Sequence, residues 1–146
     1  MNPEKVLTLL RKSCLTLPEA YETTSFGHPT FRVGRSGKKT FAVFENYRGE
    51  DTICVKATLE DQALLVLDPR FFVAPYVGKH GWTSMRTAMK GVSIDWSEVE
   101  DLVRESYRLV APKSALAQLM KLEESRPRPF RGKASKKRTS KKRKKK

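Results

Sequence analysis

The stretch "TFRVGRSGKKTFAVFENYRGEDTICVKA", residues 30–57, decides the fold class. It contains three runs rich in β-branched and aromatic residues, at 30–33, 39–45 and 52–57. The two gaps between these runs are rich in turn residues, and the first gap contains two glycines that allow positive φ. Three consecutive strands joined by short turns predict an antiparallel meander.

Helices are predicted on both sides of this meander. The first covers residues 3–15, with Asn2 as its N-cap and Pro3 at the first helical position, where a missing N–H costs nothing. The second begins with Thr58, whose spacing to an acidic residue resembles a capping box, and ends at Asp68 before a proline.

The third helix has the clearest periodicity. Apolar residues recur from Val99 to Val110 at helical spacing, Asp95 is suited to cap the start, and Pro112 ends the run. A short fourth helix is expected in the segment that begins at Lys113.

Two further strands are predicted between the second and third helices. They are "FFVAPYVG" (71–78) and "WTSMRTAM" (82–89), joined around "GKHG", and a short strand is also expected at 24–26. The order of elements predicts an α+β fold, a compact two-layer domain with an antiparallel sheet and helices packed on one face.

The charge divides the chain into a domain at 1–120 and a tail at 121–146. Residues 126–146 hold thirteen of the thirty Lys and Arg residues and no acidic residue, which leaves seventeen basic against sixteen acidic residues before them. A segment with so much charge and so little apolar surface cannot offset its ordering entropy, so the tail is expected to be disordered.

The chain has no pattern of a secreted or membrane protein. The start "MNPEKVLTLLRKS" is not a secretory signal, and no stretch approaches about 20 apolar residues. Cys14 and Cys54 match no metal or redox motif, and in a reducing compartment both are expected as thiols. We expect a cytoplasmic protein, nucleoid-associated if bacterial; the oligomeric state stays open, with a monomer as the expectation.

Catalytic residues are few. The chain has two histidines, His28 and His80, and no Cys/His cluster or phosphate-binding glycine loop. A Cys–His pair, such as Cys54 with His80, is the nucleophile and base that the sequence offers, and a strand cysteine is more often a small buried apolar residue. No enzymatic activity, cofactor or metal is therefore expected.

Basic turns beside aromatic residues favour nucleic-acid binding instead. Ordinary surface charge is the competing interpretation for these cations, and Trp82 is expected to be largely buried at the root of the second hairpin. The candidate nucleic-acid-binding residues are Arg32, Arg35, Lys38 and Lys39 on the first hairpin, Lys79, His80, Trp82, Arg86 and Lys90 on the second, and Lys136, Lys137, Arg138, Lys141, Lys142 and Arg143 in the tail.

Three ordered blocks of the sequence resemble the YjbR/MmcQ family. The blocks are "HPTFRVGRSGKKTFAVF" (28–44), "YVGKHGWTSMRT" (76–87) and "EVEDLVRESYRLVAPKSAL" (98–116). The resemblance covers roughly residues 3–118 and implies a compact α+β fold likened to that of frataxin. It also implies DNA binding through a "double wing", whose wings correspond to the turns 34–39 and 78–90.

Two features of this chain differ from those families. The basic tail is not part of the YjbR/MmcQ pattern. The first helix carries Glu4 beside Lys5, Arg11 and Lys12 rather than the acidic ridge of frataxins, which disfavours iron delivery.

The sequence leaves three functions open. The leading hypothesis is a small intracellular protein that binds nucleic acid, DNA first, with little sequence specificity. The alternatives are an adaptor module that binds an acidic partner through the tail, and a small-molecule-binding domain. A concave pocket holding His80, Tyr76 and Arg32 would favour the last.

Overall fold

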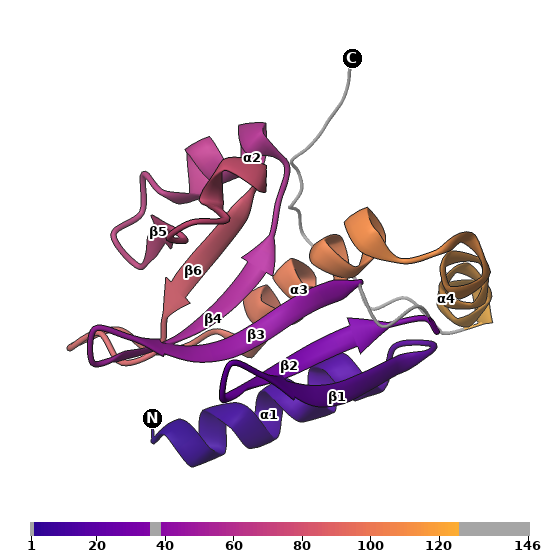
Figure 1. The fold of residues 1–146 in the computed structure, drawn as a ribbon, viewed down its shortest axis with the longest axis horizontal. Coiled ribbons are helices and arrows are strands. Elements are labelled where there is room, and N and C mark those ends of the chain that lie inside the picture. The colour runs from indigo at the N-terminus through magenta and orange to yellow at the C-terminus, as the bar shows by residue number, and fades with distance from the viewer. Residues whose placement is uncertain (1, 36–38, 126–146) are drawn as a thin grey trace.

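A computed structural model describes residues 2–35 and 39–125 (Figure 1). The elements follow in the order α1 (Pro3–Leu15), β1 (Ala20–Ser25), β2 (His28–Val33), β3 (Thr40–Tyr47), β4 (Glu50–Lys56), α2 (Leu59–Leu65), β5 (Phe71–Val73), the 3₁₀ helix η1 (Gly78–His80), β6 (Trp82–Arg86), α3 (Trp96–Val110) and α4 (Lys113–Ser125).

All six strands form one antiparallel sheet in the order β1-β2-β3-β4-β6-β5. Helix α1 packs against β1, and α3 packs against β3 and β4 and touches α1, so both helices cover the same face (Figure 1). The predicted α+β fold, with helices on one face of an antiparallel sheet, is confirmed. We call the other face of the sheet the open face.

The predicted helix starts are also confirmed. The side chain of Asn2 accepts a hydrogen bond from the Lys5 amide, and that of Thr58 accepts one from the Asp61 amide. The Asp95 carboxylate accepts from the first turn of α3. Each cap satisfies an amide that has no partner inside its own helix, which is why these local patterns predict helix starts well.

Some element bounds differ from the prediction. Strand β1 starts at Ala20, and Phe26, expected inside a strand, instead lies in the β1–β2 turn with φ 52°, next to Gly27 with φ 80°. Strand β6 ends at Arg86, although the Thr87 amide still donates to the Asp51 carbonyl in the same register. The domain boundary placed at residue 120 lies inside α4.

The core fills the space between the helices and one face of the sheet. Val6 and Leu10 of α1 meet Phe31 and Phe41 of the sheet, and all four are fully buried. The ring of Tyr107 on α3 packs edge-on against Phe41, with the ring centroids 5.4 Å apart. Burial of such large apolar side chains is the main stabilising contribution to the fold.

The antiparallel register assigns each connection to one of two ends of the sheet. The β2–β3 connection (34–39), the end of β4 and the β5–β6 connection (74–81) lie at one end, which we call the tip end. The β1–β2 turn, the β3–β4 turn and the end of β6 lie at the opposite end, which we call the turn end.

Candidate nucleic-acid interface

The tip end gathers cations from three separate parts of the chain. Arg35 and Lys39 flank the first tip, Lys79 and His80 lie in η1 at the second tip, and all four are exposed. Lys56, at the end of β4, lies between the two tips in the strand order and is half-buried. Lys56 is not among the residues predicted from the sequence, since only the strand register shows that it lies beside both tips.

These cations lack acidic partners. Among residues 2–35 and 39–125, no carboxylate forms an ion pair with Arg35, Lys39, Lys56 or Lys79. Glu60 and Asp61 lie in the first turn of α2, the helix that follows β4. The basic surface therefore comprises the two tips and the end of β4, and it does not extend onto α2. Unpaired, exposed cations can exchange water and counterions for the phosphates of a ligand.

The second tip is held rigidly on the sheet. The buried side chain of Gln62, on α2, donates to the carbonyls of Gly78 and Trp82, both at 2.9 Å. Gly78 and Gly81 are also buried, and a Cβ at Gly81 would lie 1.9 Å from the Ala57 carbonyl oxygen. The exposed side chains of this tip are therefore carried on a fixed backbone.

Trp82 begins β6, as predicted, but it is only half-buried. It pairs with Lys56, while the next pair, Val55 with Thr83, faces the core. Because side chains alternate along a strand, the indole lies on the open face, so the expected burial is met in part there and not in the core. Its backbone carbonyl receives hydrogen bonds, so the residue still anchors the tip.

Arg32 lies on the same open face, next to the first tip. Its Nε donates to the Thr40 hydroxyl at 3.2 Å, across the β2–β3 pair. The side chain is half-buried and is thereby oriented along the sheet rather than free in solvent. It adds positive charge beside the first tip.

Arg86 and Lys90 do not belong to this surface. Arg86 ends β6 at the turn end, about 13 Å along the strand from Trp82. Its guanidinium bonds the Glu50 carboxylate at 3.0 Å and the Pro69 carbonyl at 2.8 Å, and stacks 4.6 Å from the centre of the Phe72 ring. The charge of Arg86 is thus already compensated, and the segment 78–90 extends from the tip end to the turn end of the sheet.

An aromatic contact beside Arg86 shows how strongly the sheet coils. Tyr47 of β3 and Phe72 of β5 meet on the open face with ring centroids 6.0 Å apart. Their strands are three strand spacings apart, about 14 Å in a flat sheet. The coiling explains why Thr52, Cys54 and Ser84 are buried on a face that neither α1 nor α3 covers.

The hairpins themselves differ from protruding wings. Of the strands that flank the two tips, β2, β3 and β6 are each paired on both sides, and β5 is one edge of the sheet, with β1 as the other. Only the connecting tips extend beyond the sheet, so a ligand would meet the tips rather than the strands. Lys38 and the tail residues Lys136, Lys137, Arg138, Lys141, Lys142 and Arg143 lie outside the described residues.

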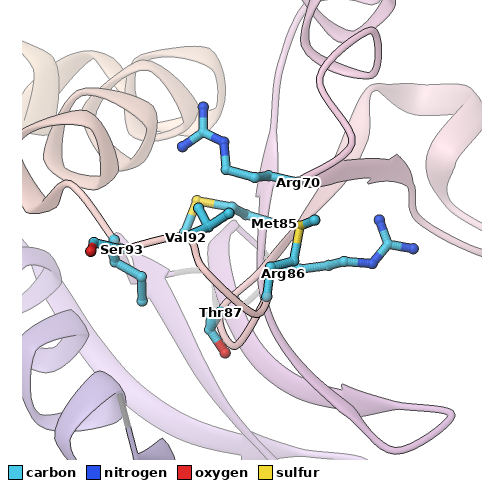
Figure 2. Close-up of a pocket in the computed structure, with 8 residues that line it drawn as sticks. Arg70, Met85, Arg86, Thr87, Val92 and Ser93 are labelled. Atoms are coloured by element: carbon cyan, nitrogen blue, oxygen red, sulfur yellow. The ribbon is translucent and has the colours of Figure 1, made fainter.

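A small hollow lies beside the end of β6, next to the segment that leads into α3. Figure 2 shows Met85 and Val92 at its centre, with the guanidinium groups of Arg70 and Arg86 pointing in different directions. Its volume is about 10 Å³, enough for roughly one water. Arg70 is already bonded to Asp68 and Glu98, and these carboxylates raise its pKa above the ordinary value.

This hollow is not the pocket that a small-molecule function requires. His80 and Tyr76 are exposed at the second tip, and neither they nor Arg32 line the hollow. Within the described parts of the chain, no three His, Cys, Asp or Glu residues are grouped as metal ligands would be. No helix in these parts is long and apolar enough to cross a membrane.

The two thiols lie on opposite faces of the sheet. Cys14, on α1, is part of the core between this helix and the sheet, and Cys54 lies on the open face, paired with Ser84. Burial, opposed by a hydrogen bond with Ser84 and assisted by the nearby Glu45, raises the pKa of Cys54 to about 12. Burial also raises the pKa of Cys14.

We expect both thiols to resist alkylation in the folded protein. At mildly alkaline pH a buried thiol with a raised pKa holds almost no thiolate, which is the reactive form. Mass spectrometry after treatment with iodoacetamide should find no modified cysteine, and two after unfolding in guanidinium. Rapid modification of Cys54 in the folded state would mean that the open face is accessible.

Comparisons with known proteins agree with this fold. The crystal structure of Deinococcus radiodurans protein DR2400, whose domain is classed as DUF419, superposes with a TM-score of 0.60 and 22% sequence identity, over 76% of this chain and 85% of that chain. At that identity the likeness shows the fold alone.

A comparison with curated protein sequences found no match. The YjbR family model matches residues 15–109, which confirms the resemblance predicted from the three sequence blocks. The chain therefore belongs to the YjbR family.

Proposed function

We propose that the protein binds nucleic acid, DNA first and with little sequence specificity, through the tip end of its sheet and its basic tail. The observation that carries the proposal is the position of Arg35, Lys39, Lys56 and Lys79. Three separate parts of the chain bring these cations to one end of the sheet, and no carboxylate of the described residues pairs with them. Phosphate contacts of this kind position a ligand without selecting its sequence.

The tail is assigned to the same binding surface, because it follows α4, and this helix packs beside the first tip. A Cβ at Gly34 would lie 3.1 Å from Pro112, just before α4, and Gln118 of α4 donates to Glu19, whose carbonyl bonds the Gly34 amide (Figure 1). The thirteen Lys and Arg residues of 126–146 follow this helix. In this proposal they supply most of the affinity through counterion release.

The placement of the candidate pair Cys54 and His80 favours a binding role over catalysis. Cys54 is buried within the sheet with a raised pKa, whereas His80 is exposed in η1. A thiol without thiolate and without a neighbouring base is a poor nucleophile. We propose a cytoplasmic, monomeric protein that needs no cofactor.

Salt titrations test the proposal. If about six phosphates are neutralised, the slope of log K against log salt should be about −5, from roughly −0.9 for each phosphate. Removal of residues 126–146 should flatten this slope and weaken binding to unrelated duplex and single-stranded sequences alike. Glutamine at Arg35, Lys39, Lys56 and Lys79 should then abolish most of the binding that remains.

The matched control removes four cations from the rest of the surface, namely Lys5, Lys12, Arg48 and Lys90. It changes the net charge by the same amount and should leave the slope of the tailless protein unchanged. Equal losses in both variants would mean that net charge, and not the tip end, attracts the ligand. If the full-length protein shows no salt-dependent binding to nucleic acid, the proposed function is wrong, and an acidic protein partner becomes the better hypothesis.

A further inference from the structure

Tyr76, at the second tip, combines two features that do not help the protein to fold. Its side chain is 95% exposed, so a large aromatic ring lies almost entirely in water. Its φ is 69°, a value that few residues other than glycine adopt. Each feature is unfavourable, and a residue that persists with both is a candidate for a functional role.

The strained backbone at Tyr76 belongs to a defined type of turn. The amide of Val77 donates to the Pro75 carbonyl at 2.7 Å, which closes a γ-turn with Tyr76 at its centre. A γ-turn with positive φ at its central residue is the rare and strained form. At Gly27 and Gly49 this chain uses glycine at positive φ, and Tyr76 is one of four described residues other than glycine with positive φ, so glycine would serve the fold at position 76 with less strain.

The backbone beside the Tyr76 ring is held in place. The hydrogen bonds from Gln62 and the tight packing at Gly78 fix the backbone that follows Tyr76. No described residue makes a hydrogen bond or ring contact with the Tyr76 side chain. The ring is therefore presented to solvent on a rigid support, which reduces the entropy lost when it meets a ligand.

The charge beside the ring indicates the chemistry of that ligand. Lys79 and His80 follow three and four residues later, both exposed on the same tip. A ligand that offers negative charge and flat aromatic faces at this spacing is a single-stranded nucleic acid, whose bases stack on exposed aromatic side chains. In a duplex the faces of the bases are already stacked on one another, so the ring has no comparable partner there.

We propose that Tyr76 stacks on an unpaired base and that the second tip therefore binds single-stranded nucleic acid. The inference rests on the proposed function, since the tip cations must first hold the phosphate backbone. It adds that the class of ligand is a strand with accessible bases. It also assigns the stacking contact to Tyr76 rather than to the half-buried Trp82.

The test compares variants of the full-length protein on three probes, namely an oligothymidine, a duplex of the same length and an abasic oligonucleotide. Tyr76→Ala should weaken binding to oligothymidine about 10-fold, which corresponds to roughly 1.4 kcal/mol. Tyr76→Phe should bind like the wild type, because stacking needs the ring and not the hydroxyl. Neither variant should change binding to the duplex or to the abasic strand, which have no free base to stack.

Phe26→Ala is the matched control. Phe26 is also a fully exposed aromatic with positive φ in a hairpin turn, at 98% exposure and φ 52°, but it lies at the turn end. Its replacement should leave binding to oligothymidine unchanged. An equal loss in both variants would show that exposed aromatic residues bind the strand wherever they lie, and would overturn the assignment to the second tip.

A stability measurement separates binding from folding. Tyr76→Gly removes the strain of positive φ, so its melting temperature should equal or exceed that of the wild type while binding to oligothymidine falls as in Tyr76→Ala. If the wild type binds all three probes and Tyr76→Ala loses nothing on oligothymidine, the stacking contact is wrong and the proposed function stands. If the wild type binds none of the probes, both are wrong. A loss of the same size on all three probes would show that Tyr76 acts through the tip structure and would also overturn the proposal.

Discussion

Replacement of Gly81 by alanine is expected to lower the free energy of unfolding by about 2–5 kcal/mol. Its φ of 97° disfavours any residue with a Cβ, at about 1–2 kcal/mol. The new Cβ would also lie 1.9 Å from the Ala57 carbonyl oxygen, and relief of such a contact costs about 1–3 kcal/mol more. Since the Ala57 amide bonds the Gly81 carbonyl, the change should separate β4 from the second tip.

Gly49→Ala is the control for this prediction. Gly49 has a similar φ of 84°, but a Cβ built there meets no atom within 4 Å. Its replacement should therefore cost only the backbone component, about 1–2 kcal/mol. Denaturant unfolding of both variants measures the difference, and equal losses would show that the close approach to Ala57 is relaxed in solution.

Replacement of Ser106 by alanine is expected to cost about 2–6 kcal/mol, although the side chain is small and alanine favours helices. The Ser106 hydroxyl is fully buried between α3 and the sheet. It donates to the Phe41 carbonyl at 2.6 Å and accepts from the Lys56 amide at 2.9 Å, so it bridges β3 and β4. Alanine would leave both backbone groups buried without a partner, at roughly 1–3 kcal/mol each.

Ser114→Ala provides the comparison for Ser106. The Ser114 hydroxyl also makes a hydrogen bond, to Glu19 at 3.1 Å, but at an exposed position where water can replace it. Its loss should stay within about 0.5 kcal/mol. Thermal unfolding of the two variants decides the matter: similar melting temperatures would mean that the bridge between β3 and β4 is dispensable or that a water takes its place.

The hydrogen bonds of Ser106 and Tyr107 show the structural role of one of the three sequence blocks. The run Glu-Ser-Tyr in the closing helix is part of the resemblance to the family. In the structure, the Ser106 hydroxyl bonds Phe41, and the Tyr107 hydroxyl donates to the Pro18 carbonyl at 2.7 Å. Both side chains satisfy backbone carbonyls inside the fold, so this block serves stability rather than ligand binding.

The sequence by itself determined the features that depend on near neighbours in the chain. The helix starts at Asn2, Thr58 and Asp95 follow from a side chain that reaches an amide two or three residues away. The meander follows from apolar runs separated by turn residues, and the fold class follows from the order of these elements. The charge of the tail is likewise a property of composition alone.

The turn at Phe26 shows where such local prediction fails. A phenylalanine is typical of a strand interior, and its position in a turn with φ 52° contradicts its ordinary preference. The pairing of β1 with β2, from Ala20 with Val33 to Ser25 with His28, overrides that preference. Strand pairing over the whole hairpin outweighs the conformational cost at one residue.

Only the tertiary structure decided which of the candidate residues share a surface. Register assigns Trp82 to the open face, since a shift of one residue reverses every side chain of a strand. The antiparallel order brings Lys56 and Lys79 to one end and sends Arg86 to the other, where Glu50 compensates its charge. These outcomes depend on contacts between residues far apart in the chain, which no local pattern encodes. The backbone that follows Tyr76 is fixed in the same way, by the hydrogen bond from Gln62 and the close approach of Val73 to Gly78.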